Sequence, residues 1–410
     1  MDFNFYMPVR LYSGEGCLRR GGEQLRSLGR RCLVVTGAHA AKACGALDDA
    51  LSALEEAGVA ATVVPGVGEN PLLSQCQAAA FAAEACRAEF LLGVGGGSVM
   101  DATKAAAWLA ANNITDGYKL FTGLRHRALP FALAGTTAGT GSEVTAFTVI
   151  TDRQNGNVKY PLADYAVRPD VAIIDPQFVW NLPKAATRDT GLDVLTHAIE
   201  AYVSVMASDY TDGLALQAIG MVFEYLPRAY KNGAADPVAR EKMHNASCIA
   251  GMAFTNAFLG LNHSMAHKLG GEFHIPHGRA NAVILPYVIA YNAQKPTKFT
   301  AFPKYETFIA DKKYAKIAAF IGCGGHTTEE SVRNLIKAVY RLEQELDCPT
   351  SIKECGVDEK LFFDRLPALA ERAHEDQCTT ANPRYPLISE IEEIYTQAYF
   401  APYQGSQSVH

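Results

Sequence analysis

Residues 90–104, FLLGVGGGSVMDATK, contain a short apolar run, a glycine-rich turn and the start of an alanine-rich stretch. The apolar run predicts a buried strand, and the alanines predict a helix directly after it. Glycines let the backbone approach a pyrophosphate, while free amides at a helix start donate hydrogen bonds to it. The alternative is a tight turn without a ligand, because the glycines match neither GxGxxG nor a Walker loop. The expected phosphate-binding turn consists of Gly95, Gly96, Gly97 and Ser98.

Similar apolar runs occur on both sides of this segment, up to about residue 182. They are RCLVVTG (31–37), AGVAATVVPGV (57–67), LPFALAGTT (129–137) and VAIIDP (171–176). Alanine-rich helical stretches separate them, and this alternation predicts βα units around a parallel sheet. We therefore expect residues 1–182 to form an α/β dinucleotide-binding domain.

Beyond residue 182 the sequence changes to long amphipathic segments. Examples are residues 188–205 (RDTGLDVLTHAIEAYVSV), 240–254 and 330–346. Apolar residues at helical spacing predict that residues 183–410 form an all-α domain that binds metal and substrate. A ligand cleft between two such domains is the expected arrangement.

The composition favours a small-molecule partner. Of the 410 residues, 49% are hydrophobic and 20% are charged, and the net charge is -6 with no long basic run. These values argue against binding to nucleic acid or to an anionic membrane. The ten cysteines include no CxxC pair, which disfavours a disulfide framework or a thiolate zinc site. Without a signal peptide or a long apolar run, the expected location is the cytoplasm.

A second polar turn, AGTTAGTGSE (134–143), follows the next predicted strand. Doubly wound folds bind ligands at the carboxyl ends of parallel strands. Two polar turns on neighbouring strands favour a dinucleotide over a lone phosphate. At the start of the predicted helix, Asp101 and Lys104 are spaced for an ion pair three residues apart, which we prefer to a catalytic role.

Three stretches in the second half carry acid and imidazole side chains at ligand-like spacing. A spacing of four residues places two side chains on one helix face. One carboxylate with several imidazoles suits Fe(II) or Zn(II) better than Mg(II) or Ca(II). Spacing alone leaves open which histidine is not a ligand, and whether the aspartate coordinates the ion or orients a histidine. The residues are Asp193 and His197, His263 and His267, and His274 and His277.

In these motifs the sequence resembles the iron-dependent, group III alcohol dehydrogenases. The matching stretches lie at 95–104, 134–145, 159–176, 191–204 and 261–282. Together with DQCTTANPRYPLISE (376–390), they look especially like the alcohol dehydrogenase half of bifunctional acetaldehyde/alcohol dehydrogenases. The resemblance implies hydride transfer between NAD or NADP and an aldehyde or alcohol. We expect a C2 to C4 aldehyde or its alcohol, and a 1,2- or 1,3-diol also stays open. It also implies one divalent ion, Fe(II) before Zn(II), and a homodimer or larger homo-oligomer.

The resemblance further implies roles for individual residues. Its metal ligands fall on Asp193, His197, His263 and His277. His267 matches a histidine beside the nicotinamide, which makes it our candidate proton relay, and His274 is left as structural. NAD-specific relatives carry an aspartate where this chain has Gly37, so the resemblance leaves NADH and NADPH open. The dinucleotide contacts fall on Asn70, Gly97, Ser98, Thr136, Thr137, Thr140 and Lys159, with Phe178 and Leu182 near the adenosine or ribose.

Several alternatives remain at this stage. An anionic aldehyde such as sulfoacetaldehyde or succinic semialdehyde would need an anchor such as Arg279 or Lys159. A lyase resembling dehydroquinate synthase would need several cationic side chains, and the metal-ligand stretches offer only Lys268 and Arg279. A binding protein that has lost catalysis is the third reading. The residues expected to line a small apolar substrate pocket are Phe147, Phe254, Phe258 and Leu259.

Overall fold

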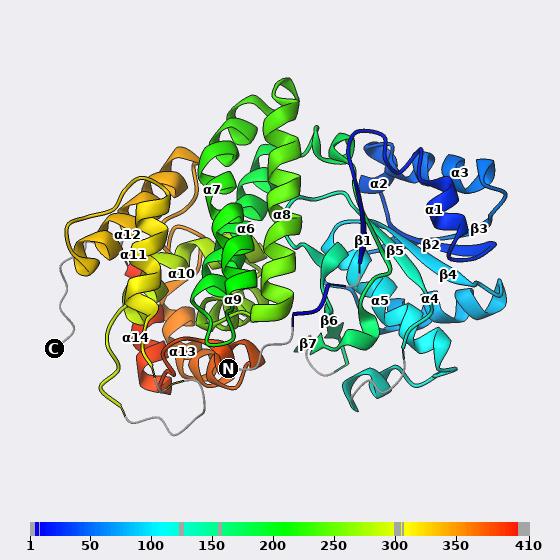
Figure 1. The fold of residues 1–410 in the computed structure, drawn as a ribbon. Coiled ribbons are helices and arrows are strands. Elements are labelled where there is room, and N and C mark those ends of the chain that lie inside the picture. The colour runs from blue at the N-terminus through cyan, green and yellow to red at the C-terminus, as the bar shows by residue number, and fades with distance from the viewer. Residues whose placement is uncertain are drawn as a thin grey trace. The chain divides into compact units, whose positions relative to one another are not determined.

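The computed structural model describes residues 5–7, 9–122, 127–154, 158–298, 305 and 307–400 (Figure 1). The chain divides into two compact units, which we describe separately. The sheet unit comprises Tyr6–Pro183 and Asn232–Thr255. The helical unit comprises Lys184–Lys231 and the described residues from Asn256 onward, with Phe5. The expected helical domain, 183–410, thus differs from this division in residues 232–255, which group with the sheet.

The sheet unit contains a six-stranded parallel sheet in the order β1-β8-β5-β4-β2-β3. Every residue of β4, β5 and β8 is buried, which explains why their sequences are continuous apolar runs rather than alternating ones. The expected α/β fold with a parallel sheet is therefore confirmed. The strands are β1 (Arg10–Ser13), β2 (Arg31–Gly37), β3 (Ala60–Val67), β4 (Phe90–Gly95), β5 (Phe131–Gly135) and β8 (Val171–Ile174).

Helices cover both faces of this sheet. On one face, α3 (Ala46–Glu56) packs with Val34 and Leu92, which point to that side of β2 and β4. On the other face, α4 (Leu73–Ala85) and α5 (Gly97–Ala111) pack with Leu33 and Leu91. The helices that follow β2 and β4 thus lie on opposite faces, although the two strands are neighbours. This is the topological switch point at which doubly wound sheets bind ligands.

The remaining elements of the sheet unit are a hairpin, most of α8 and several short helices. An antiparallel hairpin of β6 (Phe147–Asp152) and β7 (Val158–Ala163) was not anticipated from the sequence. Within α8 (Pro237–Ala257), Cys248 packs against Ile174 of the sheet. The short helices are α1 (Gly22–Arg26), α2 (Ala40–Ala43), η1 (Gly117–Thr122), η2 (Ser142–Val144), η3 (Tyr165–Val167), η4 (Pro176–Val179) and η5 (Gly233–Ala235).

The helical unit is organised around α6 (Lys184–Val203), in which every residue from Gly191 to Val203 is buried. A helix that is buried all round is a core helix. None of the helices in the described part of the chain is both long and apolar enough to span a bilayer. The other elements are α7 (Asp209–Asn232), α9 (Leu261–Phe273), α10 (His277–Asn292), α11 (Ala310–Phe320), α12 (Thr328–Glu345), α13 (Glu359–His374), η6 (Gln377–Ala381) and α14 (Ile388–Phe400).

Candidate functional site

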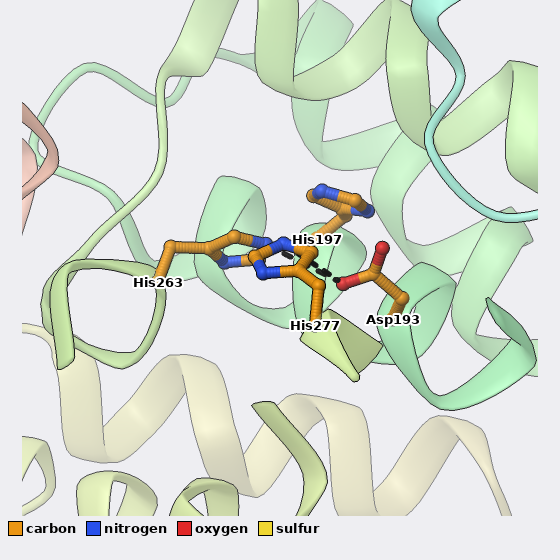
Figure 2. A group of neighbouring side chains, drawn as sticks. All are labelled: Asp193, His197, His263 and His277. Carbon is orange, nitrogen blue, oxygen red and sulfur yellow. Dashed lines mark ion pairs between the residues drawn. The ribbon is translucent and has the colours of Figure 1, made fainter. Parts of the chain in front are cut away.

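Four potential metal ligands converge inside the helical unit (Figure 2). Asp193 and His197 lie one turn apart on α6, His263 lies on α9, and His277 is the first residue of α10. One ligand atom from each of the four lies within 4.8 Å of the others. The Oδ1 atom of Asp193 is 3.7 Å from Nε2 of His263 and 3.5 Å from Nε2 of His277.

These separations fit a small divalent ion. A tetrahedral site with metal–ligand bonds of about 2.1 Å has ligand–ligand edges of about 3.4 Å. Burial alone would raise the pKa of Asp193, but charge interactions with His197, His277 and His263 hold it well below its ordinary value. An ionised carboxylate beside three imidazoles is a donor set for Fe(II) or Zn(II). The residues present therefore fit the ion implied by the resemblance.

Two further buried residues contact this ligand group, and the sequence reasoning did not identify them. Glu200, on α6, places a carboxylate oxygen 2.5 Å from Nδ1 of His263. Asn281, on α10, donates from Nδ2 to Oδ1 of Asp193 at 2.7 Å. The signal for Glu200 was its spacing, because it follows His197 by three residues and shares its helix face.

An ion-pair network joins α6 to the start of α10. Asp189 accepts from Nε of Arg188 at 2.8 Å and from a terminal nitrogen of Arg279 at 2.9 Å. A Cβ atom at Gly278 would lie 1.8 Å from the carbonyl oxygen of Asp189, so only glycine permits this approach. The network fixes the backbone beside His277. Because Arg279 is paired with Asp189, its expected use as an anchor for an anionic aldehyde loses support.

His267 lies one turn after His263 on α9. Its Nδ1 atom is 3.3 Å from Oδ2 of Asp376, which also accepts from Nζ of Lys268 at 2.7 Å. Burial lowers the pKa of His267 from its ordinary value, although Asp376 opposes the shift. A neutral imidazole held by a carboxylate can accept and release a proton, which suits the expected relay.

His267, Asp376 and Cys378 form a second group with ligand-like spacing. Oδ1 of Asp376 already accepts from the backbone amide of Cys378 at 3.0 Å. Oδ2 accepts from Nζ of Lys268 and contacts Nδ1 of His267. We therefore interpret this group as a hydrogen-bonded network that holds His267. His274 ends α9 with a φ of 56° in the left-handed region, which is a structural position.

The two polar turns of the sheet unit contact each other. A Cβ atom at Gly97 would lie 2.7 Å from Cγ2 of Thr140, so the close approach requires glycine. Gly96 caps α5 without a side-chain hydrogen bond, which leaves the first amides of the helix for a ligand. The backbone amide of Asn70 donates to Oγ of Ser98 at 3.2 Å. These features suit an anionic pyrophosphate at the helix start.

Other expected cofactor residues are placed as follows. The side-chain oxygen of Thr136 is buried and has no hydrogen-bond partner among the described residues, so it is available to a ligand. Lys159 lies in the hairpin opposite Thr151. Phe178 is 3% exposed and packs in the core on the α3 face, which leaves little of its side chain for a nucleotide. Leu182 follows η4 and accepts from Arg240 through its carbonyl oxygen at 2.9 Å.

Gly37 ends β2 beside β4, at the switch point of the sheet. Its φ lies outside the left-handed region. A Cβ atom there would be 3.4 Å from the carbonyl oxygen of Val67 and 3.6 Å from Cγ2 of Val99. Position 37 therefore accepts a Cβ atom at ordinary contact distances.

Asp101 and Lys104 were expected to form an ion pair that caps the start of α5, but their hydrogen bonds are made with other groups. Both are held inside the sheet unit: Asp101 accepts from the amide of Val149 at 2.9 Å, and Lys104 donates to the carbonyl oxygen of Phe147 at 2.6 Å. Both also contact the hydroxyl of Ser142. Burial lowers the pKa of Lys104 to about 8. Their hydrogen bonds therefore hold the chain around residues 142–149 in place and do not cap α5.

The expected lining of the substrate pocket is distributed over both units. Phe147 and Phe254 belong to the sheet unit, and their ring centroids lie 5.7 Å apart. Phe258 and Leu259 belong to the helical unit, and Phe258 has a φ of 64°. A pocket formed by all four stays a prediction.

Comparisons with known proteins identify the family of this chain. The model of the family "Iron-containing alcohol dehydrogenase" matches residues 8–176, and the model "Fe-containing alcohol dehydrogenase family, C-terminal" matches residues 187–399. The bifunctional aldehyde-alcohol dehydrogenase AdhE of Escherichia coli (strain K12) is 44% identical over 96% of this chain and 46% of its own length. The chain spans less than half the length of the aldehyde-alcohol dehydrogenases it matches.

Two relatives match over their whole length. The NADPH-dependent butanol dehydrogenase of Clostridium saccharobutylicum is 40% identical, over 97% of this chain and 98% of its own. The crystal structure of a 1,3-propanediol oxidoreductase superposes with a TM-score of 0.88 at 34% identity, covering 97% of this chain and 100% of that one. The chain therefore belongs to the iron-containing alcohol dehydrogenase family.

Proposed function

We propose that this chain is an NAD(P)-dependent alcohol dehydrogenase that interconverts a short-chain aldehyde, of two to four carbons, and its alcohol. The observation that carries the proposal is the convergence of Asp193, His197, His263 and His277 within 4.8 Å. A divalent ion held there, Fe(II) before Zn(II), would supply Lewis-acid activation of the substrate oxygen. Hydride transfer is the chemistry of the nicotinamide.

The residues of the chain then have separate tasks. The amides at the start of α5, with Ser98 and Asn70, bind the pyrophosphate and so orient the nicotinamide. His267 holds or releases the substrate proton at Nε2, since Nδ1 faces Asp376. Asp376, in turn, fixes the orientation of the His267 ring.

We further propose that the enzyme accepts both NADH and NADPH. A carboxylate at the end of β2 would bind the ribose hydroxyls of NADH and repel the 2'-phosphate of NADPH. Gly37 supplies no such group. We also infer a cytoplasmic homodimer or larger homo-oligomer, from the resemblance and the composition.

For the substrate, neutral aldehydes are favoured over anionic ones because Arg279 is paired with Asp189. The lyase reading is disfavoured for the same reason, since it needs free cationic groups at this site. The reading as a binding protein without catalysis is disfavoured by the complete ligand set.

The test is purification without oxygen, determination of bound metal, and assay of C2 to C4 aldehydes, neutral and anionic, with NADH and NADPH. We expect turnover that chelation abolishes and Fe(II) or Zn(II) restores. Protein that contains the ion but reduces none of these aldehydes would overturn the proposal.

A further inference from the structure

Each carboxylate oxygen of Glu200 contacts a different polar group of α9. It lies seven residues after Asp193 and three after His197, on the same face of α6, and is 3% exposed. Its Oε1 atom accepts from the backbone amide of Asn262 at 2.7 Å, in the first turn of α9. Its Oε2 atom lies 2.5 Å from Nδ1 of His263. One oxygen therefore caps a helix, and the other faces a metal ligand.

A carboxylate oxygen accepts hydrogen bonds, so Nδ1 of His263 is the donor in this contact. An imidazole that binds an ion is neutral and carries one proton, so with the proton on Nδ1 facing Glu200 it is Nε2 that keeps a lone pair for the ion. Nε2 is the atom that lies 3.7 Å from Oδ1 of Asp193, inside the ligand group. The contact with Glu200 thus selects the tautomer that can bind an ion.

The opposite side of the ring supports the same tautomer independently. Nδ2 of Asn262 donates to the backbone carbonyl of Asn281 at 3.1 Å and to its Oδ1 at 2.9 Å. A backbone carbonyl only accepts, so the identity of these atoms is fixed. Nδ2 of Asn281 consequently faces Nε2 of His263 at 3.2 Å. This amide nitrogen only donates, and it also faces Oδ1 of Asp193 and Nε2 of His277, so its position favours an Nε2 of His263 without a proton.

We propose that Glu200 is a positioning residue of the metal site, which fixes His263 in the tautomer with Nε2 toward the ion. The inference rests on the proposed function, because it needs the ion. A carboxylate behind a ligating imidazole orients the ring and raises its basicity, and loss of such a partner weakens metal binding about 10- to 100-fold. Glu200 acts through His263 and touches no reacting atom.

The substitution Glu200→Gln distinguishes a role in positioning His263 from a role limited to capping α9. The amide oxygen of glutamine can still accept from Asn262. Its NH2 group would then stand where Oε2 stood and donate to Nδ1 of His263. That reverses the tautomer and puts a proton on Nε2, where the ion should bind. The cap is kept, while His263 is held in the tautomer that does not suit the ion.

Glu343 supplies a matched control. It lies on α12 in the same unit, is 0% exposed, and its carboxylate has no hydrogen-bond partner among the described residues. Glu343→Gln makes the same substitution in a buried position that is not part of the ligand group. Any effect of placing a glutamine in the core appears in this variant as well.

The experiment measures the dissociation constants of Zn(II) and Co(II) in competition with a chromophoric chelator, using full-length apoprotein. For Glu200→Gln we expect constants about 10- to 100-fold larger than for the wild type, a changed visible spectrum of bound Co(II), and a melting temperature of the apoprotein like that of Glu343→Gln. Unchanged constants and an unchanged Co(II) spectrum would overturn the proposal.

If Glu200→Gln does not fold, Glu200→Asp replaces it, because the shorter side chain keeps the charge but withdraws from Nδ1. Folded Glu200→Asp that binds metal as the wild type does would also overturn the proposal. A wild-type protein that binds neither ion would overturn the proposed metal site itself. That failure is visible before any variant is made, so the two outcomes are distinct.

Discussion

Replacing Gly37 with aspartate should shift cofactor preference strongly toward NADH. Position 37 ends β2 at the switch point of the sheet, beside β4 and its glycine turn. A Cβ atom there meets nothing nearer than 3.4 Å, and the backbone does not require glycine. We therefore expect the variant to fold as the wild type does, with a carboxylate directed toward the ribose.

The size of the effect follows from the charges involved. Two unit charges about 4 Å apart repel by about 1 kcal/mol in bulk water and about 4 kcal/mol at an effective dielectric of 20. The end of β2 is half-buried, so we expect about 1 to 3 kcal/mol against the 2'-phosphate of NADPH. That corresponds to a loss of roughly 5- to 150-fold in kcat/KM with NADPH. A hydrogen bond to the ribose hydroxyls of NADH adds to the discrimination.

The assay compares kcat/KM for NADPH and NADH at low ionic strength and again at high salt. Gly37→Asn is the control, because asparagine has the same shape without the charge. The ratio should change far more for aspartate than for asparagine, and salt should reduce the difference. An equal change in both variants, or no change in either, would refute our placement of the ribose beside position 37.

Four further measurements test other parts of the structure. His277→Ala should lose the bound metal and activity together, whereas His267→Ala should keep the metal and slow turnover by about a hundredfold or more; metal analysis beside kcat separates the two. Chelation of the wild type should abolish aldehyde reduction, and activity that survives complete metal removal would contradict the mechanism. Burial raises the pKa of Glu143 to about 7 from 4.5, so the stability that its proton contributes is present below pH 4.5 and is lost as the pH rises toward 7. Glu143→Gln should therefore be more stable than the wild type at pH 8 by at most about 3 kcal/mol, but not at pH 4.5, in denaturant melts. Gly213→Ala, in α7 where a Cβ atom meets nothing within 4 Å, should raise stability by about 0.5–1 kcal/mol in the same melts, and a loss of stability would show that the position is more crowded than described.

The sequence predicted the parallel strands well because their signals are local. The run of residues 90–95 is apolar throughout, as a strand buried on both faces must be, and glycines mark its end. The hairpin of β6 and β7 was not predicted, because Pro161 lies inside β7 and a proline in a sequence argues against a strand. A proline is tolerated in an edge strand or in a two-stranded ribbon. Only the fold shows that β7 belongs to such a ribbon.

The metal site was predictable only in pieces. Spacing placed Asp193 with His197 on one helix face, but the choice of His263 and His277 over other histidines came from the family resemblance. Spacing places Glu200 on the helix face of His197, but its contact with His263 depends on the packing of α9 against α6, which no local pattern encodes. The same holds for Arg279, whose partner Asp189 lies ninety residues earlier in the chain.

The sheet unit is assembled from two stretches of chain, with Lys184–Lys231 of the other unit between them. During synthesis, β8 emerges from the ribosome about seventy residues before Cys248 and Met252, which cover Ile174 and Ala172 of that strand. Part of the apolar surface of the sheet therefore stays uncovered while the ribosome makes α6 and α7, which belong mostly to the other unit. A gene cut after residue 183 would produce a sheet that never receives this cover, whereas a transplantable nucleotide-binding module would have to include residues 232–255 as well.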